Sequence, residues 1–186
     1  MCGSRSPSAS IDGKTIVLLT IVVVTTILLI VTTRLQKELK QTKPFASREE
    51  EVYLNIQLTA ERLWWGINET IKQADLTPTQ YNVLRILRGA GKAGASCSEI
   101  SERLVTKDSD ITRLLDRLEA RRLISREREA KDRRRLIARI SEDGLRLLAG
   151  LDKPIEQCHR RQMGHLGEKQ LATLSKLLDA LRARPE

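Results

Sequence analysis

Residues 131–144, KDRRRLIARISEDG, set four basic side chains beside one aspartate and follow them with an alternating apolar run. The stretch 135–140, RLIARI, has the period-two pattern of a short strand, and so does SREREA at 125–130. Two such strands joined by a charged tip predict a β-hairpin. Ser141 follows as a typical helix N-cap. Like charges repel in water. The elements on either side of this stretch must therefore explain why its basic side chains are crowded together.

Three helical segments precede this hairpin. LTPTQYNVLRILRGAG (76–91) begins with Thr77 as N-cap, Pro78 at the first helical position and Gln80 completing a capping box. ASCSEISERLV (95–105) repeats this pattern from Ser96. TKDSDITRLLDRLEARRLI (106–124) has a buried apolar stripe and an outward polar, basic face, with Thr106 or Asp108 as its cap. A short helix, a turn and a longer helix with such a face indicate a helix-turn-helix.

Longer helices flank this region. Apolar side chains recur every three or four positions in residues 48–74, and they do so again in residues 142–184, after Ser141. Pro154 predicts a kink or break in the second segment, and the sequence HLG (165–167) interrupts it. The expected fold is therefore mainly α, with a small β-hairpin wing and helical regions on both sides.

The N-terminus carries a different signal. Residues 16–33, IVLLTIVVVTTILLIVTT, contain no charge, proline or glycine and predict a transmembrane helix. Residues 1–15 form a tail before it, and the basic residues 34–47 follow as a linker. The positive-inside rule favours a single-pass protein with its C-terminal domain in the cytoplasm. A buried core helix and translated upstream sequence are the alternatives; in the second case the protein is cytoplasmic.

Composition restricts the function. A net charge of +9 and a pI near 9.8 favour a polyanionic partner, and 3% aromatic residues argue against base stacking. Three dispersed cysteines fit a fold without disulfides. No glycine-rich phosphate loop or nucleophile motif occurs, so no enzyme and no cofactor is expected. Cys158, His159 and His165 lack the spacing of a zinc site, and no metal is expected.

Residues 48–184 resemble the MarR family of winged-helix transcription regulators. The resemblance is carried by LTPTQYNVLRIL, SEISERL, ITRLLDRLEARRLISR and DRRRLIARISEDG, in that order. The last matches a family wing pattern at Asp132, Arg133, Arg134, Ile140, Ser141 and Gly144. The resemblance implies a winged helix-turn-helix at about 76–141 and a homodimer built from helices at about 48–74 and 142–184. It also implies double-stranded DNA as partner. Most family members lack a transmembrane segment.

DNA-binding roles follow from this resemblance. The wing arginines would contact phosphates and the minor groove, where DNA charge offsets their mutual repulsion, with Arg134 as the main probe. Asp132 would fix the shape of the wing tip, and Asp110 would either accept a hydrogen bond from cytosine or orient Arg113. The expected DNA-binding residues are Lys107, Ser109, Asp110, Thr112, Arg113, Arg117, Arg133, Arg134 and Arg135.

Two further features are assigned less specifically. Family members often respond to a small aromatic effector, for which Trp64, Trp65 and Tyr81 are candidates, although core packing is the favoured interpretation of these aromatics. Cys97 begins a helix, and an inert thiol is favoured over a redox sensor. A competing function is a membrane-tethered basic interaction module, in which the winged helix serves only as a scaffold. The sequence does not distinguish repression from activation.

Overall fold

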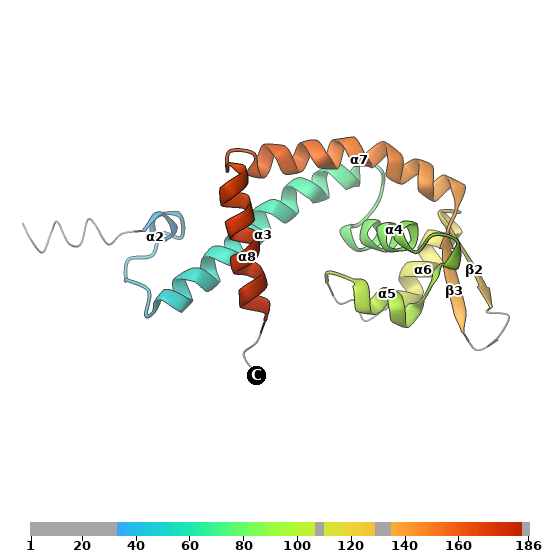
Figure 1. The fold of residues 1–186 in the computed structure, drawn as a ribbon, viewed down its shortest axis with the longest axis horizontal. Helices are drawn as coiled ribbons and strands as arrows, with labels where there is room; N and C mark the ends of the chain where they lie inside the picture. The colour runs from blue at the N-terminus through green and yellow to red at the C-terminus, as the bar shows by residue number, and fades with distance from the viewer. Residues whose placement is uncertain (1–32, 107–109, 129–134, 184–186) are drawn as a thin grey trace, which may run out of the picture. The chain divides into compact units, whose positions relative to one another are not determined.

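The computed structural model describes residues 33–106, 110–128 and 135–183. The chain forms two compact units, Met1–Thr59 and Ala60–Glu186. In the described residues, helices dominate and are accompanied by one small antiparallel sheet, which confirms the expected fold class (Figure 1). The elements are α2 Arg34–Glu38, α3 Arg48–Lys72, α4 Pro78–Ala90, the 3₁₀ turn η1 Gly91–Ala93, β1 Ala95–Ser96, α5 Cys97–Arg103, α6 Ile111–Ala120, β2 Ile124–Arg128, β3 Leu136–Ile140, α7 Glu142–Met163 and α8 Glu168–Arg182.

The first unit contains a short helix that the sequence pattern did not predict. The segment 34–47, expected as a linker, begins with α2, which Thr33 and Gln36 start with a capping box. The side-chain Nε2 of Gln36 then donates to the carbonyl of Lys43 at 3.2 Å and fixes the following turn. Residues 16–32 of the expected transmembrane segment lie outside the described residues. Among the helices that the structure describes, none is both long and apolar enough to cross a bilayer.

Local capping starts α4 and α5 where the sequence predicts. Thr77 accepts from the Gln80 amide while the Gln80 side chain accepts from Thr77, and Pro78 occupies the first position of α4. Ser96 and Glu99 form the same reciprocal pair at α5. Such pairs satisfy amide groups that the first helical turn leaves without partners. The predicted starts of α4 and α5 are confirmed.

The sheet has the strand order β1-β3-β2. In the predicted hairpin, β2 pairs antiparallel with β3 from Ile124 opposite Ile140 to Arg128 opposite Leu136. The third strand, β1, was not predicted because two residues carry no readable alternation. It pairs Ala95 with Ala138.

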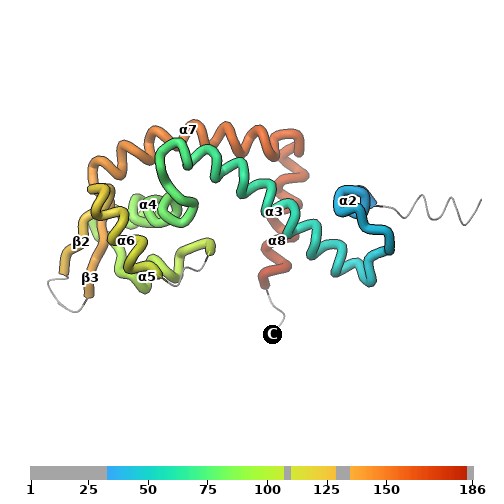
Figure 2. The backbone as a smooth tube through the Cα atoms, turned by 180° about the vertical axis from the view of Figure 1, so that it is seen from behind, coloured from blue at the N-terminus to red at the C-terminus, as the bar shows by residue number. Residues whose placement is uncertain are grey.

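One hydrophobic core in the described residues fixes the positions of α4, α5, α6 and the strands. We call this region, residues 76–141, the winged-helix lobe. Leu84 and Leu87 of α4, Ile100 of α5 and Leu118 of α6 are all fully buried. Leu148 of α7 joins the same core, and Arg88 of α4 pairs with Asp152 of α7 at 2.9 Å. Figure 2 shows α4 lying against α7 on the same side as α5 and α6.

Helix α7 continues through Pro154, so of the predicted kink or break, the break is wrong. A proline inside a helix leaves the carbonyl four residues earlier without its amide partner. That residue is Gly150, which is exposed, so water can satisfy the carbonyl. The interruption predicted at HLG is confirmed, because α7 ends at Met163 and α8 begins at Glu168.

Candidate nucleic-acid interface

Helix α6 has two chemically distinct sides. Ile111, Leu114, Leu115 and Leu118 are buried in the core, as the sequence predicts. Thr112, Arg113, Asp116 and Arg117 are exposed on the other side. The buried stripe therefore fixes the rotation of the helix about its axis. A face of hydrogen-bonding and cationic groups is left free to meet a ligand.

Asp110 begins this helix and also contacts its first arginine. Its carboxylate accepts from the Arg113 amide at 3.2 Å, so Asp110 is the N-cap, not Thr106 or Asp108 as predicted. The same carboxylate lies 3.3 Å from the Arg113 guanidinium. Of the two roles expected for Asp110, this contact favours orientation of Arg113. The Arg113 side chain remains 77% exposed and can reach a partner.

Arg126 was missed by sequence reasoning and ties the wing to α6. From strand β2, its guanidinium contacts Glu119 at 2.5 Å and Asp116 at 2.6 Å. Its side chain is only 15% exposed. Hydrogen bonding to Glu119, more than the opposing effect of burial, raises the pKa of Arg126 above its ordinary value. In the sequence this residue is one of many arginines; only folding brings both carboxylates to it.

The base of the wing is held by further ion pairs. Arg135 lies 3.7 Å from Glu99 of α5. Hydrogen bonds from Ser96 lower the pKa of Glu99. Arg139 of β3 pairs with Glu127 of β2 at 3.1 Å and donates to the Lys92 carbonyl at 2.9 Å.

The structure thus brings part of the predicted site together. Asp110, Thr112, Arg113 and Arg117 share α6 or its cap, and Arg135 lies beside α5. Their contacts with DNA remain predictions. The other predicted residues lie outside the described part of the chain: Lys107, Ser109, Asp132, Arg133 and Arg134.

The C-terminal end of α6 is attached to the end of α3. Arg121 donates to the carbonyls of Ala74 and Asp75, the former at 3.2 Å. Both carbonyls lie in the turn that follows the last helical residue of α3. Arg121 therefore links the predicted recognition helix to the segment leading out of α3.

The three aromatic candidates for an effector pocket do not share one cavity. Trp64 and Tyr81 line a cavity of about 430 Å³, whereas Trp65 lines another of about 750 Å³ beside Arg117. Trp64 and Trp65 are 45% and 54% exposed, so the favoured interpretation of core packing is wrong for both. The interpretation of core packing is confirmed for Tyr81, which is buried in the core. Arg85 lies over the Tyr81 ring at 5.8 Å.

Cysteines and metal ligands add no further site in the described residues. Cys97 is half-buried at the start of α5 and Cys158 is buried in α7. Within 33–106, 110–128 and 135–183, no three His, Cys, Asp or Glu side chains gather to hold a metal ion.

Known proteins are similar to the winged-helix lobe in sequence and in the arrangement of its elements. A model described as the MarR family matches residues 74–135. The HTH-type transcriptional repressor MdtR of Bacillus subtilis is 32% identical over 94 residues, which are 50% of this chain and 59% of that repressor. A MarR transcription factor from Planctomyces limnophilus is 38% identical; the match covers 73% of this chain and 98% of that one, with a TM-score of 0.57. The chain belongs to the MarR family.

The MarR family consists of transcription regulators and not of enzymes, which agrees with the expectation from the sequence. A third relative is a MarR variant from E. coli solved in complex with operator DNA. It is 24% identical with a TM-score of 0.62, and the match covers 68% of this chain and 89% of that one. At this identity the likeness concerns the fold alone. This MarR-family chain spans 59% of the B. subtilis repressor, less than two thirds of that relative's length.

Proposed function

We propose that this MarR-family chain is a sequence-selective transcription regulator that binds double-stranded DNA as a homodimer and represses nearby genes. One observation carries the proposal: α6 presents an exposed polar and cationic face while its apolar stripe is buried in the core. A net charge of +9 favours the DNA polyanion. The operator complex of the E. coli relative and the repressor function named for MdtR support the same conclusion.

The residues divide by the part of the DNA that they contact. Ser109, Thr112 and Arg113 read base edges in the major groove, and a bidentate arginine–guanine contact gives about 1–3 kcal/mol of discrimination. Lys107 and Arg117 contact phosphates. The wing residues 133–135 probe the minor groove and the flanking backbone, and Asp132 shapes the wing tip.

Dimerisation is part of this mechanism, because two recognition helices need half-sites about one DNA turn apart. Leu174, Leu177 and Leu181 of α8 are 42%, 63% and 62% exposed. Apolar side chains repeated on one helix face are costly in water and favour burial against a second copy. We assign α8 and α3 to the dimer contact.

Footprinting of the full chain on its own promoter tests DNA reading. Arg113→Ala removes the proposed base contact, so protection of the specific site is lost while weak general binding remains. Arg160→Ala is the matched control, because Arg160 is a 79% exposed arginine of α7 whose pair with Glu156 lies within one helix. If both variants kept the same base preference, the proposed contact of Arg113 with base edges would be contradicted.

The competing function, a membrane-tethered basic interaction module, gives a different result in a gel shift under heparin competition. A regulator retains its preferred duplex against heparin, because base contacts add to the charge attraction. A module that binds through charge alone releases all duplexes equally. The exposed Thr112 and Arg113 on α6 favour the regulator.

The effector proposal is a small aromatic molecule in the cavity lined by Trp64, Tyr81 and Arg85. An exposed indole and a cationic group beside a buried phenol suit a flat aromatic ring. Titration of the full chain with aromatic acids, read as quenching of Trp64 fluorescence in a Trp65→Phe variant, tests it. A cavity that binds none of them leaves the emission unchanged.

The membrane part of the proposal concerns residues 16–33, which we assign to a single membrane-spanning segment with the regulator on the cytoplasmic side. Val24→Arg sets a charge in the middle of this segment, at a cost of about 2.5–3.5 kcal/mol. Carbonate extraction of cell membranes should retain the native chain and release much of the variant. Complete release of both would contradict the anchor.

A further inference from the structure

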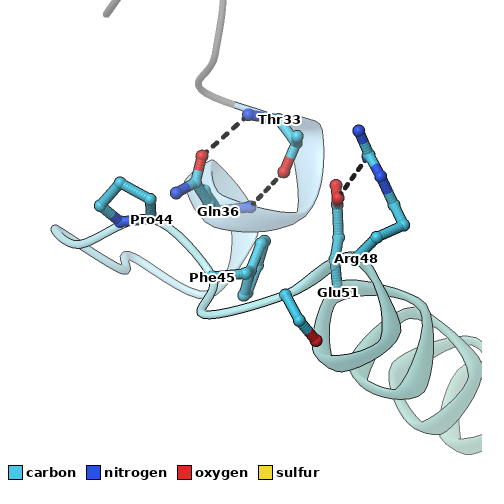
Figure 3. A pocket seen from close by; sticks show the side chains of 7 residues that line it. Thr33, Gln36, Pro44, Phe45, Arg48 and Glu51 are labelled. Carbon is cyan, nitrogen blue, oxygen red and sulfur yellow. Dashed lines mark hydrogen bonds and ion pairs between the residues drawn. The ribbon is translucent and has the colours of Figure 1, made fainter.

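Thr33 is the point at which the apolar N-terminal segment gives way to a folded turn. Its backbone is extended (φ −68°, ψ 158°), and its side chain caps α2 by accepting from the Gln36 amide. Figure 3 shows this reciprocal pair at the start of the turn. Helical dihedrals therefore cannot continue from residue 32 into α2 without interruption. The break lies at the last residue of the proposed transmembrane segment.

The turn after Thr33 is held by its own contacts. Leu35 and Gln36 are buried, at 4% and 6% exposure. The Gln36 side chain bonds both Thr33 and Lys43, so it connects the two ends of the turn. At the far end, the Glu50 carboxylate accepts from the Ala46 amide at 2.6 Å. Seven residues line an open pocket of about 310 Å³ here: Thr33, Gln36, Pro44, Phe45, Ser47, Arg48 and Glu51 (Figure 3).

The basic side chains of this turn fall into two groups. The arginines are compensated, because Arg34 contacts Glu38 at 2.8 Å and Arg48 contacts Glu51 at 2.6 Å. Lys37, Lys40 and Lys43 are exposed and form no ion pair within the part of the chain that the structure describes. We call these three residues the lysine collar.

Lys40 occupies a backbone conformation that usually favours glycine. It follows the C-cap of α2 and has φ 51°, the left-handed conformation in which glycine is usual. Its side chain is nevertheless exposed to solvent. All three cations of the collar lie within ten residues of Thr33, on a turn whose shape is set by buried side chains.

We propose that the lysine collar binds the phosphate headgroups of anionic lipids at the membrane surface. The inference rests on the proposed transmembrane segment, which would bring the collar to the headgroup region. Uncompensated ammonium groups next to a membrane span are attracted by the negative potential of an anionic leaflet, and the attraction fades within about 10 Å at ordinary salt. The partner is thus a lipid surface of negative charge, distinct from the DNA that α6 is proposed to meet.

Acylation of the full chain in lipid vesicles tests the collar directly. The chain is reconstituted in phosphatidylcholine alone or mixed with phosphatidylglycerol and treated with a membrane-impermeant amine reagent. Mass spectrometry then reads each lysine. We expect the collar to be acylated about five-fold more slowly in the anionic vesicles, and high salt to abolish the difference. Lys153, an exposed lysine of α7, serves as the internal control and should react equally in both.

The outcomes separate the collar from the anchor. If the chain floats with both kinds of vesicle but the collar lysines are acylated at the same rate in both, the transmembrane segment is supported and lipid binding by the collar is contradicted. If the chain floats with neither, both proposals are overturned. Protection of the collar by duplex DNA in neutral detergent would assign these lysines to DNA instead and also overturn the inference.

A charge-neutralising variant provides a second readout. The full chain with Lys37→Gln, Lys40→Gln and Lys43→Gln is extracted from mixed membranes in polymer-bounded lipid discs, and the co-extracted lipids are quantified. We expect anionic lipid to be enriched around the native chain and around Lys153→Gln, and not around the triple variant. Equal enrichment in all three would contradict the collar.

Discussion

Arg113 and Arg126 illustrate at the residue scale how one side-chain type serves two roles in the winged-helix lobe. Arg113 is 77% exposed, and its contact with Asp110 orients the guanidinium without burying it. Arg126 is 15% exposed and fully engaged by Asp116 and Glu119. An exposed arginine is available to a ligand, whereas an engaged one stabilises the site. The two arginines should therefore fail in different ways when replaced.

Replacing Arg126 with methionine should reduce stability as well as DNA binding. The change leaves Asp116 and Glu119 facing each other without a cation, and because both are partly exposed we expect a loss of about 1–2 kcal/mol in the free energy of unfolding. Urea titration measures it. Arg160→Met, at a solvent-exposed pair of α7, should stay within about 0.5 kcal/mol of the native chain. Equal stabilities would show that Arg126 does not hold the wing to α6.

Arg134→Ala belongs to the same scale, although its position lies outside the described residues. If Arg134 contacts DNA phosphate or the minor groove, its loss should weaken binding to all sequences and lower the salt slope by about one. Fluorescence anisotropy across a salt series measures both quantities. An unchanged slope would remove this residue from the interface.

At the element scale, the smallest strand depends on one glycine. Gly94 precedes β1 with φ +70°, and an added Cβ would lie 2.4 Å from the Ala138 carbonyl of β3. We expect Gly94→Ala to destabilise the fold by about 1–3 kcal/mol, because this backbone conformation is nearly restricted to glycine. Gly89→Ala is the control: an added Cβ there, in α4, meets nothing within 4 Å. Thermal unfolding should separate the two, and a stable Gly94→Ala chain would contradict the close approach.

The start of α5 should respond to pH. Hydrogen bonds from Ser96 lower the pKa of Glu99 in the folded chain. A lowered folded pKa contributes stability above the unfolded pKa, and this contribution is lost as the pH falls through the folded pKa. Glu99→Gln should therefore flatten part of the decline in urea midpoint between about pH 6 and about pH 3. Glu168→Gln, in the first turn of α8, should retain the native decline; parallel curves for all three chains would exclude the effect.

On the scale of the whole molecule, DNA binding and dimerisation should be coupled. Leu177→Glu sets a charge on the exposed apolar face of α8, so we expect the dimer dissociation constant to rise at least about tenfold. Operator affinity should fall with it, because one lobe alone meets one half-site. Sedimentation and anisotropy measure the two effects. Lys176→Gln alters the adjacent exposed position and should leave both unchanged; a Leu177→Glu chain that dimerises normally would move the interface elsewhere.

The sequence predicts much of this architecture because its strongest signals are local. Thr77 and Ser96 reach amides three residues away, and the stripe of α6 lies on one helix face. Sequence reasoning failed where neighbouring signals compete or where exposure in the folded chain decides. Asp110 caps α6 in place of two plausible neighbours, α7 continues past Pro154, and Trp64 and Trp65 remain exposed. These outcomes depend on which of several possible caps is used and on which groups stay exposed to water after folding.

The amino-acid sequence by itself determined the starts of α4 and α5, the hairpin and the cationic character of the chain, because capping, alternation and charge act over a few residues. The tertiary structure alone decided which arginine stays exposed and which is held by two carboxylates. Arg126 meets Asp116 and Glu119 only after β2 lies beside α6, and Arg121 meets Ala74 only after α6 reaches the end of α3. The physical reason is that a charged side chain acts through neighbours that the fold brings to it.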